Sequence, residues 1–176
     1  MADPGSGHRH MNVVLTGFMA TGKSTVGRLL AARLRYGFVD TDRIIEERHG
    51  PIPVIFSTEG EAAFRRIERD VAIELSGLSS LVVSTGGGMM LDPVNADALA
   101  SSGMVVCLTA SPKVILRRVG GSRAGERRPL LSGADPEARI RELLTEREAA
   151  YAAFRQISTD GRPPSEVAEE IAALVG

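Results

Sequence analysis

The sequence is poor in cysteine, in aromatic rings and in net charge. Of its 176 residues one is cysteine and none is tryptophan, aromatic residues make up 4%, and the formal net charge at pH 7 is −1. The single cysteine, Cys107, cannot form a disulfide within the chain and lies in an apolar run, so we expect a buried side chain and a reducing, cytoplasmic location. The near-neutral charge and scattered aromatics argue against a nucleic-acid partner, and no apolar run is long enough to span a bilayer.

The rest of the composition is typical of a globular chain. Hydrophobic residues make up 43% and charged residues 24%, and the length is close to that of one ordinary domain. The first ten residues contain no apolar segment of the kind that a signal peptide needs. We expect residues 1–10 to be an expression-vector remnant, Met11 to be the natural start, and residues 11–176 to form a single domain.

Short apolar runs alternate with helical patterns along the chain. Nearly unbroken apolar runs predict strands at 12–16, 38–39, 81–84 and 104–109, with a weaker one around Ile157. Apolar periodicity and capping residues predict helices at 26–34, 61–75, 93–101, 114–119, 140–154 and 167–174. Strands that are apolar on both faces and alternate with helices predict an α/β fold with a parallel sheet.

The most informative stretch is residues 17–24, Gly-Phe-Met-Ala-Thr-Gly-Lys-Ser, which matches the P-loop pattern G-x-x-x-x-G-K-S without departure. It lies between a predicted strand and a predicted helix. In this context the backbone N–H groups and the positive end of the helix dipole are expected to bind phosphate. The alternative, a glycine-rich turn that binds no ligand, is disfavoured. Lys23 can reach the β- and γ-phosphates, and the Ser24 hydroxyl is placed to ligand Mg²⁺ directly. The residues predicted to bind ATP here are Gly17, Ala20, Thr21, Gly22, Lys23, Ser24 and Thr25.

A long segment at about 120–134 is rich in glycine and arginine. Together with the two residues of the preceding helix, the stretch from Arg117 to Arg128 holds five arginines and one glutamate, a local charge of +4. Long connections in compact domains are often functional, and a kinase must exclude water from the transferred phosphoryl group. We therefore expect a phosphate-covering lid rather than only a basic surface.

Two further signals follow predicted strands. Asp-Thr-Asp at 40–42 offers two carboxylates, one of which can point toward Mg²⁺ through water, with Asp40 as the candidate, and the other toward an acceptor hydroxyl. The same pattern also fits a helix cap at Asp42. Three glycines at 86–88 allow close approach of the backbone. No Walker B aspartate ends the strand at 81–84.

Two predicted helices carry arginines that, taken alone, would be solvated. The segments are Phe-Arg-Arg-Ile-Glu at 64–68 and Thr-Glu-Arg at 145–147.

In their order along the chain, these motifs resemble the shikimate kinase family over nearly the whole length from Met11. The set is G-F-M-A-T-G-K-S, D-T-D, F-R-R-I-E, G-G-G, R-R-P-L-L and a late arginine before a tyrosine. The resemblance implies a three-layer α/β/α P-loop kinase fold, with a lid and a five-stranded parallel sheet of order 2-3-1-4-5. It implies transfer of the γ-phosphoryl group of ATP to the 3-hydroxyl of shikimate, with Mg²⁺, by a cytoplasmic monomer on the route to aromatic amino acids.

The resemblance also implies a role for each matching residue. Arg65 and Arg147 would bind the acceptor's carboxylate, and Asp42 would orient the attacking hydroxyl and accept its proton. The catalytic residues would be Lys23, Asp42 and Arg128, with Arg128 preferred to Arg127 because it directly precedes Pro-Leu-Leu. The acceptor segment would span about 42–70, and the other acceptor residues would be Phe64, Gly86, Gly87 and Gly88. Further ATP-binding residues, around the adenine, would be Arg118, Arg162 and Pro164.

Two alternatives remain open. A gluconate-type kinase on the same fold would also bind a polyhydroxy acid, although the F-R-R-I-E and G-G-G pair favours shikimate. A non-catalytic switch that only binds ATP would need no acceptor site, so Lys23, Ser24, Asp42 and the arginine-rich segment argue against it. The sequence departs from the family pattern in one place, a lid that looks a few residues longer over 122–127.

Overall fold

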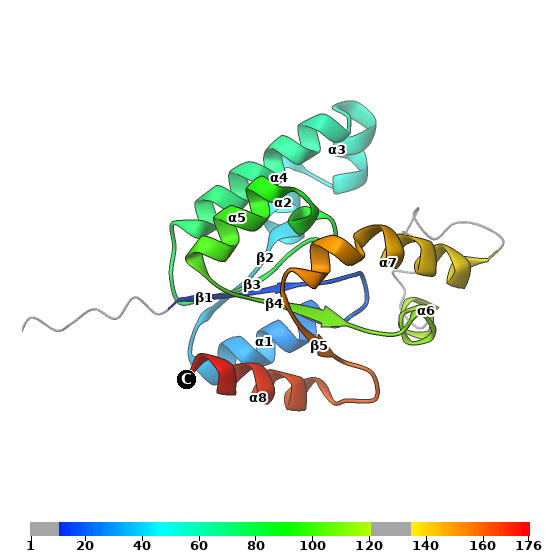
Figure 1. Cartoon of the computed structure of the whole chain (residues 1–176). Coiled ribbons are helices and arrows are strands. Elements are labelled where there is room, and N and C mark those ends of the chain that lie inside the picture. Colours follow the sequence, from blue (N-terminus) through cyan, green and yellow to red (C-terminus); the bar gives the residue numbers. More distant parts are fainter. Residues whose placement is uncertain (1–10, 121–134) are drawn as a thin grey trace, which may run out of the picture.

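The computed structural model describes residues 11–120 and 135–176 (Figure 1). The expected vector remnant and nearly all of the expected lid, Arg128 included, lie outside these residues. None of the helices in the described part is both long and apolar enough to cross a membrane. Along the chain the elements are β1 (Asn12–Thr16), α1 (Lys23–Leu34), β2 (Gly37–Asp40), α2 (Thr41–His49), α3 (Ile52–Thr58), α4 (Glu61–Ser76), β3 (Leu81–Ser84), the 3₁₀ turn η1 (Met89–Leu91), α5 (Pro93–Ser102), β4 (Gly103–Thr109), α6 (Pro112–Gly120), α7 (Pro136–Ala152), β5 (Arg155–Ser158) and α8 (Pro164–Val175).

The five strands of the described residues form one parallel sheet in the order β2-β3-β1-β4-β5, which confirms the expected order. Helices α1 and α8 cover one face, and α4 and α5 cover the other (Figure 1). The expected three layers are therefore present. Parallel strands need such cover because the crossover helices that connect them pack on the faces of the sheet.

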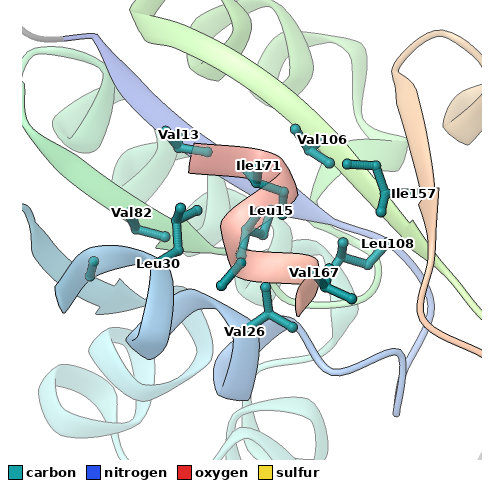
Figure 2. Packing of buried hydrophobic residues seen from close by; sticks show 12 residues of the cluster. Val13, Leu15, Val26, Leu30, Val82, Val106, Leu108, Ile157, Val167 and Ile171 are labelled. Atoms are coloured by element: carbon teal, nitrogen blue, oxygen red, sulfur yellow. The ribbon is translucent and has the colours of Figure 1, made fainter. Parts of the chain in front are cut away.

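The central strand supplies side chains to both layers in alternation. Val13 and Leu15 pack with Leu30 of α1 and Ile171 of α8 (Figure 2), whereas Val14 enters the cluster beneath α4 and α5. Each of these side chains is fully buried. Burying one such aliphatic side chain stabilises the fold by about 1.5–3 kcal/mol, so both layers hold the strand in place.

A third apolar cluster lies beside the carboxyl end of β4. It joins Phe18, from the loop after β1, to Cys107 of β4 and to residues of α6 and α7 that include Tyr151. Cys107 is fully buried, as expected, and burial raises the pKa of its thiol to about 11. The cysteine therefore behaves as a small apolar side chain.

The predicted strands and helices are all present, with ends that differ by a few residues, but the prediction missed α2 and α3. Helix α2 buries only Thr41 and Ile45, and the seven-residue α3 buries only Ile55, so neither shows an apolar period.

The interpretation of Asp42 as a helix cap is wrong. Asp40 occupies the cap position of α2 and accepts a hydrogen bond from the Arg43 N–H. Asp42 lies in the first turn, which leaves its carboxylate available for other contacts.

The amino end of β1 is fixed by a buried asparagine. Asn12 is fully buried, and its Nδ2 donates to the carbonyl oxygens of Leu78 at 2.9 Å and Leu75 at 3.3 Å. Its Oδ1 accepts from the Leu81 N–H at 3.0 Å. One side chain thus satisfies the backbone where α4 ends and β3 begins.

Asn12→Ala should lower the free energy of unfolding by about 2–4 kcal/mol, because it removes the side-chain hydrogen bonds to the backbone of Leu75, Leu78 and Leu81 and leaves a gap at a fully buried position. Asn12 lies at the end of β1 opposite the P-loop, so the Michaelis constants should not change. Urea unfolding and steady-state kinetics measure the two effects. Ser102→Ala is the control. Ser102 Oγ accepts only one hydrogen bond from Asn12, at 3.3 Å, so removing this hydroxyl should lower the free energy of unfolding by less than about 1 kcal/mol. A fully stable Asn12→Ala protein would contradict the role of this side chain.

Candidate active site

A cavity of about 630 Å³ opens where the carboxyl ends of β1, β2 and β3 meet. Ligands gather at this edge in open parallel sheets. Of the predicted site residues, the cavity wall contains Ala20, Gly22, Lys23, Ser24, Thr25, Asp40, Asp42, Phe64, Arg65, Gly86, Gly87, Gly88 and Arg147. The structure thus brings the predicted nucleotide and acceptor residues into one space. Predicted residues outside this wall are Gly17, Thr21, Arg118, Arg162 and Pro164, and Arg128 lies outside the described residues.

The P-loop takes its shape from a glycine and from the start of α1. Gly17 has φ +130°, and a Cβ there would lie 2.2 Å from the carbonyl oxygen of Leu108, so a side chain does not fit. Among the described residues, none accepts a hydrogen bond from the backbone N–H groups of residues 19–22. Such a set of N–H groups at a helix start is an anion site. The Lys23 ammonium donates to the carbonyl oxygens of Gly17 and Phe18, each at 2.9 Å, which holds its charge over the loop.

Three oxygen-bearing side chains meet beside the P-loop. Ser24 Oγ donates to Asp40 Oδ2 at 2.7 Å and lies 3.2 Å from Ser84 Oγ. Asp40 and Ser84 are neighbours because they pair in the register of β2 and β3. Hydroxyl and carboxylate oxygens are the ligands that Mg²⁺ prefers, so this group fits the ion. In the part of the chain that the structure describes, no three His, Cys, Asp or Glu side chains gather as a metal site.

Asp42 lies in the cavity wall with a perturbed acidity. Burial raises its pKa from 3.8 to about 6, the negative charge of Asp40 adds to the rise, and Lys23 opposes it. The glycine turn that follows β3 packs against this carboxylate: a Cβ on Gly86 would lie 2.3 Å from Asp42 Oδ1. A carboxyl group whose pKa lies near neutrality can both orient a hydroxyl and take its proton.

Arg65 is held by acidic side chains of its own helix. Its Nη1 donates to Glu68 Oε2 at 2.6 Å, and its Nη2 donates to Glu61 Oε1 at 3.2 Å. Burial works to lower the pKa of Arg65, but these two carboxylates outweigh it and raise the pKa. The Glu68 side chain is only 2% exposed, and burial raises its pKa against the influence of Arg65. Sequence reasoning gave Glu68 no role, although its position three residues after Arg65 was a usable signal.

Arg147 approaches the glycine turn from α7. Its Nη1 donates to the Gly87 carbonyl at 3.2 Å, and its Cζ lies 5.2 Å from the centre of the Phe18 ring. On the other side of the turn, a Cβ on Gly88 would lie 3.1 Å from Arg65 Nη1. Two guanidinium groups therefore flank one short turn, an arrangement that suits an anionic group.

The residues predicted to surround adenine lie beyond the P-loop. Arg118 donates to the carbonyl oxygen of Ala20 at 3.0 Å and to both the hydroxyl and the carbonyl oxygen of Thr159. It thereby ties the P-loop to the segment after β5. Arg162 forms ion pairs with Glu166 and Glu170 of α8, the helix that Pro164 begins. Their predicted contact with adenine stays a prediction.

Comparison with known proteins identifies the family. The family model for shikimate kinase matches residues 19–175. The chain belongs to the shikimate kinase family. A shikimate kinase from Thermus thermophilus is 50% identical over 161 residues, which cover 90% of this chain and 86% of that protein. A solved shikimate kinase from Acinetobacter baumannii, in complex with shikimate, has a TM-score of 0.85 and 37% identity, and the match covers 94% of this chain and 92% of that one.

More distant structures share the fold alone. A gluconokinase from Sinorhizobium meliloti 1021 has a TM-score of 0.64 at 22% identity, with 95% of this chain and 92% of that chain covered. Membership of the shikimate kinase family makes this chain an ATP-using phosphotransferase. It also confirms the resemblance drawn from the motifs and excludes a protein that only binds nucleotide.

Gly86→Ala should lower kcat more than tenfold while the affinity for ATP stays near that of the wild type. The added methyl group would meet Asp42 Oδ1, so the carboxylate must rotate away from its place in the cavity. Steady-state kinetics together with calorimetric titration of ATP measure the two effects. A Gly86→Ala enzyme with normal kcat would show that the position of Asp42 is not critical.

Asp42→Asn should stabilise the fold in a pH-dependent way. Because the pKa of Asp42 is raised to about 6, the folded state holds a proton that the unfolded chain has released, and stability falls as pH rises from about 4 to 6. The neutral asparagine avoids this loss, so it should add about 1–2 kcal/mol at pH 8, after allowance for the partial exposure of Asp42, and almost nothing at pH 4. Urea unfolding at both pH values measures the difference. An equal gain at pH 4 and pH 8 would show that charge is not its cause.

Proposed function

We propose that this chain transfers the γ-phosphoryl group of ATP to the 3-hydroxyl of shikimate, giving ADP and shikimate 3-phosphate. The observation that carries the proposal is the single cavity that contains Lys23 of the P-loop, the carboxylate of Asp42, and the guanidinium groups of Arg65 and Arg147. Family membership, and the relative from Acinetobacter baumannii that was solved with shikimate, support the choice of acceptor.

The acceptor's carboxylate binds between the two arginines. A planar guanidinium matches a carboxylate through two parallel hydrogen bonds, and Arg65 and Arg147 approach the glycine turn from different helices. Glu68 holds Arg65 in place from the buried side. The backbone N–H groups of Gly87 and Gly88 add neutral donors, and the Phe64 ring forms part of the wall.

The reaction joins the 3-hydroxyl oxygen to the γ-phosphorus and breaks the bond from that phosphorus to the β,γ-bridging oxygen. Asp42 accepts the hydrogen bond of the attacking hydroxyl and takes its proton, while ADP leaves. Phosphoryl transfer passes through a loose transition state, so catalysis depends on alignment and on neutralising charge. Lys23 supplies positive charge at the β- and γ-phosphates when it exchanges its carbonyl partners for phosphate oxygens.

Mg²⁺ fits the oxygen group beside the P-loop. Ser24 would ligand the ion directly and Asp40 would bind it through water, in agreement with their 2.7 Å contact. When bound, the ion draws negative charge from the β- and γ-phosphates. We further propose that Arg128 covers the phosphates and that Arg118, Arg162 and Pro164 border the adenine. The hydrogen bond from Arg118 to the carbonyl oxygen of the P-loop residue Ala20 supports the placement of Arg118 beside the nucleotide.

The decisive test is ADP release from Mg·ATP, measured with shikimate, with gluconate and without an acceptor. Release should depend on shikimate, and it should fall at least a hundredfold in Asp42→Asn because the hydroxyl loses the group that takes its proton. The control is Glu47→Gln, an exposed residue of α2 paired with Arg43, which should behave as wild type. Release stimulated by gluconate alone would reassign the acceptor, and release by neither acid, from folded protein that binds ATP, would overturn the proposal.

A further inference from the structure

One side chain of the P-loop, that of Phe18, does not line the cavity. The Phe18 side chain is 1% exposed, and it packs in the apolar cluster with Cys107, Ile115 and Tyr151. Its backbone carbonyl serves the nucleotide side, since it accepts from Lys23 Nζ at 2.9 Å. The ring does not reach the P-loop's anion site. It has a different partner, because the guanidinium of Arg147 lies over it, with 5.2 Å from Cζ to the ring centre.

The same guanidinium has a second support at the glycine turn. Arg147 Nη1 donates to the Gly87 carbonyl at 3.2 Å, and Tyr151 OH donates to that same carbonyl at 2.9 Å. Tyr151 follows Arg147 by four residues on α7, so both side chains project from one face of the helix. The Tyr151 side chain is 6% exposed, which fixes the position of its hydroxyl.

The two supports restrict Arg147 in complementary ways. The aromatic face attracts the positive charge and sets the plane of the guanidinium. The Gly87 carbonyl, itself held by Tyr151, takes one N–H and sets the rotation of the guanidinium. An arginine has five N–H donors, so this arrangement leaves others for a ligand in the cavity that Arg147 lines. A free arginine side chain loses much rotamer entropy when it binds, and holding it in advance reduces that loss.

We propose that Phe18 and Tyr151 are positioning residues that hold Arg147 ready for the carboxylate of the acceptor. A P-loop side chain then serves the acceptor half of the site while the backbone of the same residue serves the nucleotide half. This proposal rests on the proposed function, in which Arg147 binds that carboxylate.

Phe18→Leu keeps an apolar side chain but removes the ring. It should weaken shikimate binding about three- to tenfold by calorimetric titration, raise the Michaelis constant for shikimate by the same factor, and leave kcat and the ATP affinity within about twofold. Tyr151→Phe, which loses only the hydroxyl, should show the same pattern with a smaller change. Phe38→Leu is the matched control, because its ring also lies under an arginine, Arg28 at 5.0 Å, but outside the cavity wall. It should bind shikimate as the wild type does.

A double-mutant cycle separates positioning from general damage. Phe18 acts through Arg147, so Phe18→Leu should weaken shikimate binding no further in an Arg147→Ala protein. A shikimate analogue with a hydroxymethyl group in place of the carboxylate should bind weakly, and equally to the wild type and to Phe18→Leu. Additive losses in the cycle, or an equal loss for acid and alcohol, would mean that Phe18→Leu only disturbs packing, and the proposal would be overturned.

The remaining outcomes separate this proposal from the one on which it rests. If Arg147→Ala binds shikimate normally, the assignment of Arg147 to the carboxylate is wrong. If Arg147→Ala weakens binding but Phe18→Leu does not, only the positioning role is wrong. Fluorinated phenylalanines at position 18 cover the case in which Phe18→Leu does not fold. They retain the ring, but fluorine withdraws electron density and so weakens the negative potential of the ring face. Shikimate affinity should then fall stepwise with each added fluorine, and an unchanged affinity would refute the role of the ring.

Discussion

The parallel pairing of β1 with β3 on one side and β4 on the other is the constraint on which the site depends. It sends the P-loop, the turn after β3 and the end of β4 out of the same edge of the sheet. The pairing of Asp40 with Ser84 extends this edge to β2 and brings a carboxylate to the Ser24 hydroxyl. Gly17 shows how closely the elements approach, because its position against Leu108 leaves no room for a side chain. Burial on both faces keeps these strands in register, so the packing of apolar residues sets the geometry of polar ones.

The cavity balances charges that would be unfavourable singly. Asp40 and Asp42 repel each other, and Lys23 offsets part of that repulsion. Glu68 is buried, which is tolerated because Arg65 bonds to it directly. Functional sites often retain such groups at the expense of fold stability, and the raised pKa of Asp42 is an instance of that trade. The core clusters around α1, α8, α4 and α5 supply the stability that the site gives up.

Local sequence signals predicted the parts of this structure that depend on neighbours in the chain. The strand–loop–helix context located Lys23 and Ser24, and nearly unbroken apolar runs located β1, β2, β3 and β4, whereas β5 gave only a weak signal around Ile157. Helices α2 and α3 were not predicted because each buries too few apolar residues to show a helical period. Arg65 and Arg147 could be assigned only through the family resemblance, since an arginine on a helix is usually solvated. The contact of Phe18 with Arg147 joins residues far apart in the chain, and no local pattern encodes it.

The ion pair between Arg65 and Glu68 bears on which anions the cavity admits. ATP carries several negative charges, and two unpaired guanidinium groups beside a P-loop would attract its phosphates as strongly as they attract an acid. Glu68 and Glu61 offset the positive charge of Arg65, whose remaining N–H groups still act as directed hydrogen-bond donors. A small carboxylate can still use the directed donors, whereas a triphosphate gains little from a site whose net charge is low. The acid pair of α4 therefore leaves Arg65 with directed donors but little net positive charge at this end of the cavity.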